Sequence, residues 1–291
     1  MSLNVFGCPR TTRESHFQTL AQQKKEGKAF HTCGIFINAS YINHGCYSNA
    51  RRSFIGDMQI VRASRNLPAD SELFFWYAIP NHELSYEKTQ EKFQNWGFNC
   101  TCVMCEEHKN TKNAVLKKRS ALLQDLTDAF GSRSGADLPK AERVLAALEK
   151  TYSVPAATVP RLALWDPYLL LARLYNSNNQ QDKVVLTAWK VLEALGFVIE
   201  RQNPASAGSA FEVVQWGLMQ DFVVEAWVLL WAAFSKVASE LCERAEECAK
   251  TAYRICVGED VTFDERYGKM AQQAMFEGLD LGQAFAAMTI G

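Results

Sequence analysis

The sequence predicts an α+β fold in two unequal parts, and three observations support this prediction. Before about residue 108, turn residues and short alternating apolar runs favour strands and hairpins. Beyond that point, apolar residues recur at helical spacing over long segments, which favours amphipathic helices. Three cysteines crowd into residues 100–105, just before the change, in a polar stretch that is typical of a metal-binding loop.

Composition excludes several classes of partner. The chain has 291 residues, with 31 basic and 32 acidic side chains, so its net charge of -1 gives no drive toward nucleic acid or an anionic membrane. Residues 1–13 contain no apolar signal segment, and no apolar run reaches the ~18 residues that a membrane span needs. Nine unevenly spaced cysteines fit a reducing compartment. We therefore expect an intracellular protein, in the nucleus or the cytoplasm, with no direct nucleic-acid or membrane partner; its oligomeric state is left open.

Short strands and short helices are expected in the first part. Residues 53–63 read as a hairpin whose turn is Gly56-Asp57, and residues 72–77 read as a short aromatic strand. Residues 13–23 and 84–93 carry apolar residues at helical spacing. The rest of the stretch before residue 34 reads as loop.

Long helices are expected in the second part, punctuated by breaks near residues 131–135, 154–155 and 202–204. They are placed at residues 113–130, 139–152, 160–175, 181–195, 210–236, 239–256 and 263–279. Small residues at expected helix crossings favour helical hairpins of a tetratricopeptide-like kind, but a plain helical bundle is an equal alternative. The tryptophans here are most simply core residues, although some could face a groove and grip a partner peptide.

The cysteines divide into two groups. Cys100, Cys102 and Cys105 have C-x-C-x-x-C spacing, which lets a loop turn back so that the thiolates share one zinc ion. A closed zinc site has four N or S ligands, so these three leave one position to fill. The alternative is three buried thiols. The cysteines at 242, 248 and 256 follow a helical pattern and are expected in the core, and those at 8 and 33 are expected to be unligated.

Three motifs, in the right order, resemble the C-terminal half of a SET domain and its post-SET segment. Residues 34–49 parallel the family stretch that ends in N-H-S-C-x-P-N, and here they contain Asn43-His44-Gly45-Cys46. Residues 63–77 parallel A-x-R-x-I-x-x-G-E-E-L-T-F-D-Y, and residues 98–105 parallel F-x-C-x-C-x-x-C. The helical remainder more loosely resembles the C-terminal domain of SET-and-MYND lysine methyltransferases and of fungal SET proteins with helical repeats.

The resemblance implies a division of the chain. Residues 1–33 would be a helical, insert-like segment, residues 34–80 the C-terminal half of a partial SET β-fold, residues 81–108 the zinc-binding post-SET segment, and residues 109–291 the tetratricopeptide-like helical domain. In a SET domain, the N-H-x-C segment is threaded beside the later strands in a knot-like arrangement.

The family's activity is the transfer of a methyl group from S-adenosyl-L-methionine to a protein lysine. In the resemblance, Tyr77 is the catalytic tyrosine that orients the amine. The residues implied to bind the cofactor are Asn43, His44, Tyr41 and Phe98. The residues implied to ligate zinc are Cys46, Cys100, Cys102 and Cys105. Outside the resemblance, Tyr77 reads as a core tyrosine, His44 as a turn cap, Tyr41 as a packing residue and Cys46 as a buried thiol.

Departures from the family pattern qualify this expectation. No G-x-G cofactor segment is recognised before residue 34, so the chain reads as a truncated SET domain that has lost activity as it stands and exposes apolar strand faces. Gly45 stands where the family has Ser, Ser48 where it has Pro, and Trp76 where it has Asp. The function expected is that of a SET-family lysine methyltransferase acting on a protein substrate. The alternative is a non-catalytic, zinc-containing scaffold that binds other proteins.

Overall fold

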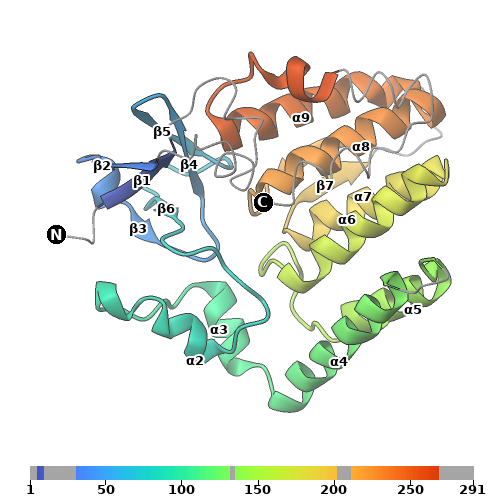
Figure 1. The fold of residues 1–291 in the computed structure, drawn as a ribbon, viewed down its shortest axis with the longest axis horizontal. Helices are drawn as coiled ribbons and strands as arrows, with labels where there is room; N and C mark the ends of the chain where they lie inside the picture. The colour runs from blue at the N-terminus through green and yellow to red at the C-terminus, as the bar shows by residue number, and fades with distance from the viewer. Residues whose placement is uncertain (1–4, 10–30, 132–134, 202–210, 269–291) are drawn as a thin grey trace.

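The computed structural model describes residues 5–9, 31–131, 135–201 and 211–268. Strands gather toward the N-terminal end of the chain, and a series of helices makes up most of the remainder (Figure 1). Within the described residues the strands form four two-stranded ladders rather than one large sheet. The mixed helix and strand composition agrees with the α+β prediction.

Two antiparallel strand pairs form the outer part of the β region. β1 (Val5–Pro9) pairs with β2 (His31–Ile35), although the sequence led us to expect helix and loop over residues 1–33. The two strands were not recognised because residues 10–30 separate β1 from β2. A strand of five residues also shows too little period-2 alternation to be identified from the sequence. The helix expected at residues 13–23 lies outside the described residues.

The second antiparallel pair is the predicted hairpin. β4 (Ala50–Ile55) pairs with β5 (Met58–Ala63), and Gly56 takes the left-handed φ of 61° in the turn. Glycine adopts this conformation without the steric cost that a Cβ would bring. The Gly56-Asp57 signal is therefore confirmed.

A short parallel pair threads two distant segments together. β3 (Asn43–His44) pairs with β6 (Phe74–Phe75), with Asn43 opposite Phe74 and His44 opposite Phe75. The buried side chain of Asn49 donates to the Glu72 carbonyl at 2.8 Å and accepts from the Phe74 amide at 2.7 Å. These bonds hold β6 against the 43–49 segment, so the predicted aromatic strand is present but short.

Two short helices surround the cysteine-rich segment. α2 (Tyr86–Glu91) starts at Ser85, whose hydroxyl caps the helix by accepting from the Lys88 amide at 3.3 Å. The 3₁₀ turn η3 (Gln94–Trp96) ends at Gly97, whose φ is 74°, and α3 (Val103–Asn110) follows. The helix expected at residues 84–93 is confirmed as a shorter one.

The remaining helices lie side by side along one half of the molecule (Figure 1). They are α4 (Asn113–Phe130), α5 (Leu138–Glu149), α6 (Leu162–Ser177), α7 (Gln181–Ala194), α8 (Asp221–Val237) and α9 (Cys242–Val257), with the short turns η4 (Ser239–Leu241), η5 (Asp264–Gly268) and η2 (Ala39–Tyr41) elsewhere in the chain. Their facing sides form the largest core, and the tryptophans and cysteines expected there lie in or against it. No helix of the described residues is long and apolar enough to cross a membrane.

The prediction of one helix over residues 210–236 is wrong at its start. β8 (Phe211–Gln215) pairs with β7 (Val198–Arg201), and α8 begins only at Asp221. The segment around Val213 alternates between buried and exposed side chains, which is the period of a strand. Gly217 then passes so close to the Leu195 carbonyl that a Cβ would lie 2.4 Å from its oxygen, so this turn accepts only glycine.

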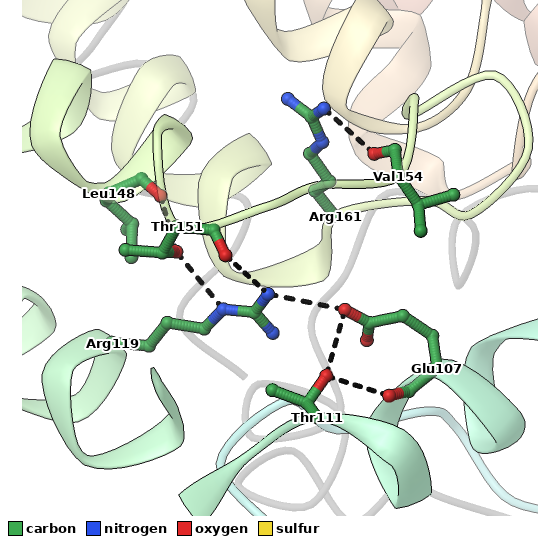
Figure 2. Close-up of polar contacts among 7 residues, drawn as sticks. All are labelled: Glu107, Thr111, Arg119, Leu148, Thr151, Val154 and Arg161. Atoms are coloured by element: carbon green, nitrogen blue, oxygen red, sulfur yellow. Dashed lines mark hydrogen bonds and ion pairs between the residues drawn. The ribbon is translucent and has the colours of Figure 1, made fainter. Parts of the chain in front are cut away.

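A polar network joins α3 to the helices that follow. Figure 2 shows Arg119 of α4 between Glu107 of α3 and Thr151 beyond α5. The Arg119 Nη2 group donates to the Glu107 carboxylate at 3.3 Å and to the Thr151 carbonyl at 3.2 Å. Its guanidinium also lies 3.6 Å from the centre of the Tyr152 ring. Because both charged groups are largely buried, this network fixes the cysteine-rich segment against α4 and α5.

Apolar side chains are exposed near the strand pairs. Ile35, Ile37 and Tyr41 expose 65%, 71% and 80% of their surface.

Candidate metal centre and methyltransferase site

Four cysteines from two separate segments meet at one point. The Sγ atoms of Cys46, Cys100, Cys102 and Cys105 all lie within 4.8 Å of one another. Cys46 Sγ is 3.9 Å from Cys100 Sγ and 3.6 Å from Cys105 Sγ. Zinc–thiolate bonds of about 2.3 Å at tetrahedral angles place sulfur atoms about 3.8 Å apart. The donor set therefore fits one tetrahedrally bound ion, with Cys46 in the position that the C-x-C-x-x-C motif leaves open.

Local structure explains why the three clustered cysteines converge. Cys102 is the residue that caps the start of α3, and Cys105 lies in its first turn, three residues on and on the same face. Cys100 is held from α2, because the Gln90 side chain accepts from its amide at 2.7 Å and donates to its carbonyl at 3.3 Å. The positive end of α3 also favours thiolates at its start.

Gln90 was not recognised from the sequence. The sequence carried a signal for it, because Gln90 is a polar residue on the same helical face as Tyr86 and Phe93. In the structure its side chain is buried. A buried amide on an apolar helix face must find hydrogen-bond partners, and the backbone of Cys100 supplies them here.

The crowded thiols perturb one another's ionisation. Hydrogen bonding with Cys100 raises the pKa of Cys46 well above its usual range, and burial acts in the same direction. The pKa of Cys100 is lowered instead, chiefly by hydrogen bonding with Cys102. Hydrogen bonding with Cys100 raises the pKa of Cys102, but bonds with Cys105 and Cys46 outweigh it and bring the value to about 6. Thiolates packed this closely repel one another, and a cation would remove that repulsion.

His44 connects the cysteine cluster to the predicted catalytic tyrosine. The Tyr77 amide donates to His44 Nδ1 at 3.1 Å, and His44 Nε2 lies 3.4 Å from Cys46 Sγ. Because Nδ1 accepts, the neutral ring carries its proton on Nε2 and donates it toward the sulfur. The buried His44 therefore acts as a hydrogen-bond partner of the cluster rather than as a ligand in it.

Aromatic rings pack around His44 and Tyr77. Phe98 stacks on the fully buried Phe93 at 5.3 Å between ring centres, and Phe93 lies 4.2 Å from the His44 ring. Trp96 lies 5.3 Å from Tyr77. Phe98 thus lies in this aromatic cluster, together with Phe93 and Trp96, which were not singled out from the sequence. Their spacing of three residues, at the start and the end of η3, was the available signal.

The Tyr77 side chain is half-buried and has a defined polar contact. Its hydroxyl donates to the Ile42 carbonyl at 2.9 Å. Burial raises the pKa of Tyr77, and the nearby Arg52 only partly opposes this effect. The phenol therefore stays protonated at neutral pH, and its oxygen retains lone pairs that can accept a hydrogen bond.

Two of the expected cofactor residues point toward solvent. The exposed Asn43 amide donates to the Glu72 carboxylate at 2.7 Å, and Tyr41 is 80% exposed at the end of η2. A cavity of about 500 Å³ lies instead between the cysteine-rich segment and α4, and Cys46 and Cys105 line one side of it. The structure thus brings His44, Phe98 and Tyr77 together with the cysteines, while Asn43 lies beside them and Tyr41 farther out.

Comparison with known proteins identifies the strand region. Residues 10–78 match the sequence model of the SET domain family. This match places a SET-domain segment within the chain. This match begins at residue 10, upstream of residue 34, where the first recognised motif starts, so it takes in part of the segment that was read as insert-like.

The curated relatives extend the likeness. A protein of Gibberella zeae named methyltransferase is 40% identical over 270 residues, which are 91% of this chain and 37% of that protein. The histone-lysine N-methyltransferase SET5 of Yarrowia lipolytica is 34% identical over 84 residues, 28% of this chain and 19% of that protein. The protein-lysine N-methyltransferase SMYD4 of Homo sapiens is 30% identical over 74 residues, 25% of this chain and 9% of that protein. The matched part of the chain thus spans 37% or less of the length of each of these relatives.

Proposed function

We propose that this chain is the S-adenosyl-L-methionine-dependent part of a protein-lysine methyltransferase, and that its four cysteines hold a structural zinc ion. The observation that carries the proposal is the link through His44, which joins the N-H-x-C segment, Tyr77 and the cysteine cluster. The SET-domain match and the names of the relatives support it. Four protein ligands would leave the metal no open position, so its role is to order this wall rather than to activate water.

The residues around Tyr77 suit amine chemistry. A free lysine has a pKa of about 10.4, so a methyltransferase must deprotonate and orient it. The Tyr77 hydroxyl donates a hydrogen bond to the Ile42 carbonyl, so its oxygen is free to accept a hydrogen bond from an N–H of the amine. That second hydrogen bond would direct the nitrogen lone pair. When bound, S-adenosyl-L-methionine supplies a methyl group on a positively charged sulfur. We assign its contacts to Asn43, His44, Tyr41 and Phe98, and the protein substrate to this same region.

A specific observation favours the alternative of a non-catalytic scaffold. The Asn43 amide is engaged by Glu72 and exposed, and Tyr41 reaches into solvent, so neither encloses a cofactor here. In that alternative, the helical part, with α6 packed on α7 and α8 on α9, is a tetratricopeptide-like surface for a partner peptide. Reduced cysteines in the described part of the chain fit an intracellular setting for either function.

Calorimetric titration with S-adenosyl-L-methionine separates these functions. We expect micromolar binding by the zinc-loaded chain, and a loss of about tenfold or more, about 1.4 kcal/mol, in Asn43→Ala. Tyr77→Phe should bind the cofactor nearly as well but lower methyl transfer to protein lysines about 100-fold, because the amine loses its orienting group. The matched control is Tyr175→Phe, which removes a buried hydroxyl from α6. A folded, zinc-loaded chain that binds no cofactor would contradict the proposal and favour the scaffold.

A further inference from the structure

Trp76 departs from the SET pattern, which has Asp before the tyrosine, and the structure gives this indole a defined contact. Its Nε1 donates to the carbonyl of Cys46 at 2.9 Å. The backbone of one cysteine in the metal cluster is thus held by a side chain from the β6 segment. An aspartate at this position has no donor with which to make that bond.

Side chains alternate in direction along the extended β6 segment, so the Trp76 side chain points away from those of Phe75 and Tyr77. Phe75 and Tyr77 pack in the small cluster among the strands, whereas Trp76 packs against the large core of the helices. Successive side chains of an extended segment point to opposite faces, so a large ring at this position must reach toward the helical part.

A charged contact extends the connection to α8. The Arg51 guanidinium lies 5.2 Å from the centre of the Trp76 ring, and its Nη2 is 2.7 Å from the carboxylate of Asp221, the first residue of α8. Arg51 is largely buried, and a cation over an indole contributes most where water is excluded. A chain of direct contacts therefore runs from Cys46 through Trp76 and Arg51 to the start of α8.

We propose that Trp76 is a positioning residue that couples metal binding at the four cysteines to the seating of α8 against the strands. Metal binding fixes the Cys46 backbone, the Cys46 carbonyl fixes the indole, and the indole fixes Arg51 where it can hold Asp221. The inference rests on the metal ion of the proposed function but not on methyl transfer. It also accounts for a large aromatic residue at a position where the family has a small acid.

A second route between the cluster and the helices must be distinguished from this one. Cys105 lies on α3, and Glu107 of the same helix contacts Arg119 of α4 (Figure 2). Metal binding could in principle act on the helices through that contact. The two routes make different predictions, because only the one through Trp76 ends at α8.

Hydrogen exchange of the whole chain, with zinc bound and after chelation, tests the proposal. In the wild-type chain we expect zinc to slow amide exchange in the first two turns of α8 about fivefold, the effect of one well-placed hydrogen bond. Trp76→Phe keeps an aromatic side chain but is smaller and lacks the indole N–H, so it should abolish most of that effect. Zinc should still slow exchange in α3 of this variant, which shows that the variant folds and binds the metal.

Two variants serve as controls. Trp165→Phe alters a ring that stacks on Phe222 of α8 at 4.7 Å without contacting Cys46, and it should keep the zinc effect on α8. Arg119→Met should keep it as well. The proposal is overturned if Trp76→Phe retains the full effect, if Arg119→Met removes it, or if zinc protects α3 but leaves α8 of the wild-type chain unchanged.

Discussion

At the scale of single residues, the site depends on side chains that hold other residues in place. Gln90 binds the Cys100 backbone, Asn49 binds the β6 backbone, and His44 accepts from the Tyr77 amide. Each is a buried polar group whose partner lies at least ten residues away in the chain. If one of these side chains is removed, its partner is left without a hydrogen bond, and this destabilises the folded state by more than the net free energy that the hydrogen bond contributes.

Gln90→Ala should weaken metal binding without removing a ligand. The amide and carbonyl of Cys100 lose their partners, so the thiolate is no longer held in position, and groups of this kind typically change metal affinity about 10- to 100-fold. Competition with a chromophoric chelator measures the change. Gln94→Ala, at an exposed position, is the matched control and should bind as the wild type does. Equal affinities for the two variants would contradict the role given to Gln90.

Asn49→Ala should destabilise the chain through β6. It removes two hydrogen bonds and leaves the Phe74 amide unpaired, so we expect a loss of about 2–4 kcal/mol in the free energy of unfolding. Urea denaturation followed by circular dichroism measures this. Asn66→Ala changes an exposed asparagine and should cost less than about 0.5 kcal/mol. A loss no larger than that of the control would show that the clamp on β6 is unimportant.

At the scale of elements, a buried ion pair joins α6 and α8. Arg173 Nε and Nη2 donate to the two carboxylate oxygens of Glu225, at 2.5 and 2.7 Å, and both side chains are largely buried. Burial raises the pKa of Glu225, and the bond with Arg173 opposes that rise. Removing one partner of the ion pair is therefore expected to lower the free energy of unfolding far more than replacing both partners with apolar residues.

Arg173→Met should destabilise the chain by about 3–5 kcal/mol, and Arg173→Met with Glu225→Leu should recover most of that loss. The single variant should also acquire a pH dependence. Without its arginine the buried carboxyl has a raised pKa, so the folded state binds a proton more tightly than the unfolded state, whose value is near 4.5. Stability is then lost as pH rises from the unfolded pKa through the folded one.

Unfolding measured at pH 5 and pH 8 checks this sign. The single variant should be relatively more stable at pH 5 than at pH 8, and the double variant should show no such difference from the wild type. A single variant whose deficit is the same at both pH values would mean that Glu225 does not become protonated.

At the scale of the whole molecule, sequence reasoning succeeded where the signals were local. The limits of α4 and the β4–β5 hairpin follow from patterns within about twenty residues. The pairing of β1 with β2 and the Trp76 contact depend on segments far apart in the chain. The β7–β8 ladder is local, but it was missed because the residues of β8 were read as the start of the following helix. The C-x-C-x-x-C spacing predicted three cysteines of the cluster from the residues alone, but the fourth required the family resemblance.

The joining of distant segments at the four cysteines is the central claim, and counting zinc in the purified chain tests it most directly. We expect one zinc ion per wild-type chain and one per Cys248→Ser chain, because Cys248 packs in the helical core. Cys46→Ser should lose the ion or bind it far more weakly, since it removes the ligand from the N-H-x-C segment. Full zinc content with unchanged affinity in Cys46→Ser, or a folded wild-type chain that takes up none, would contradict the account.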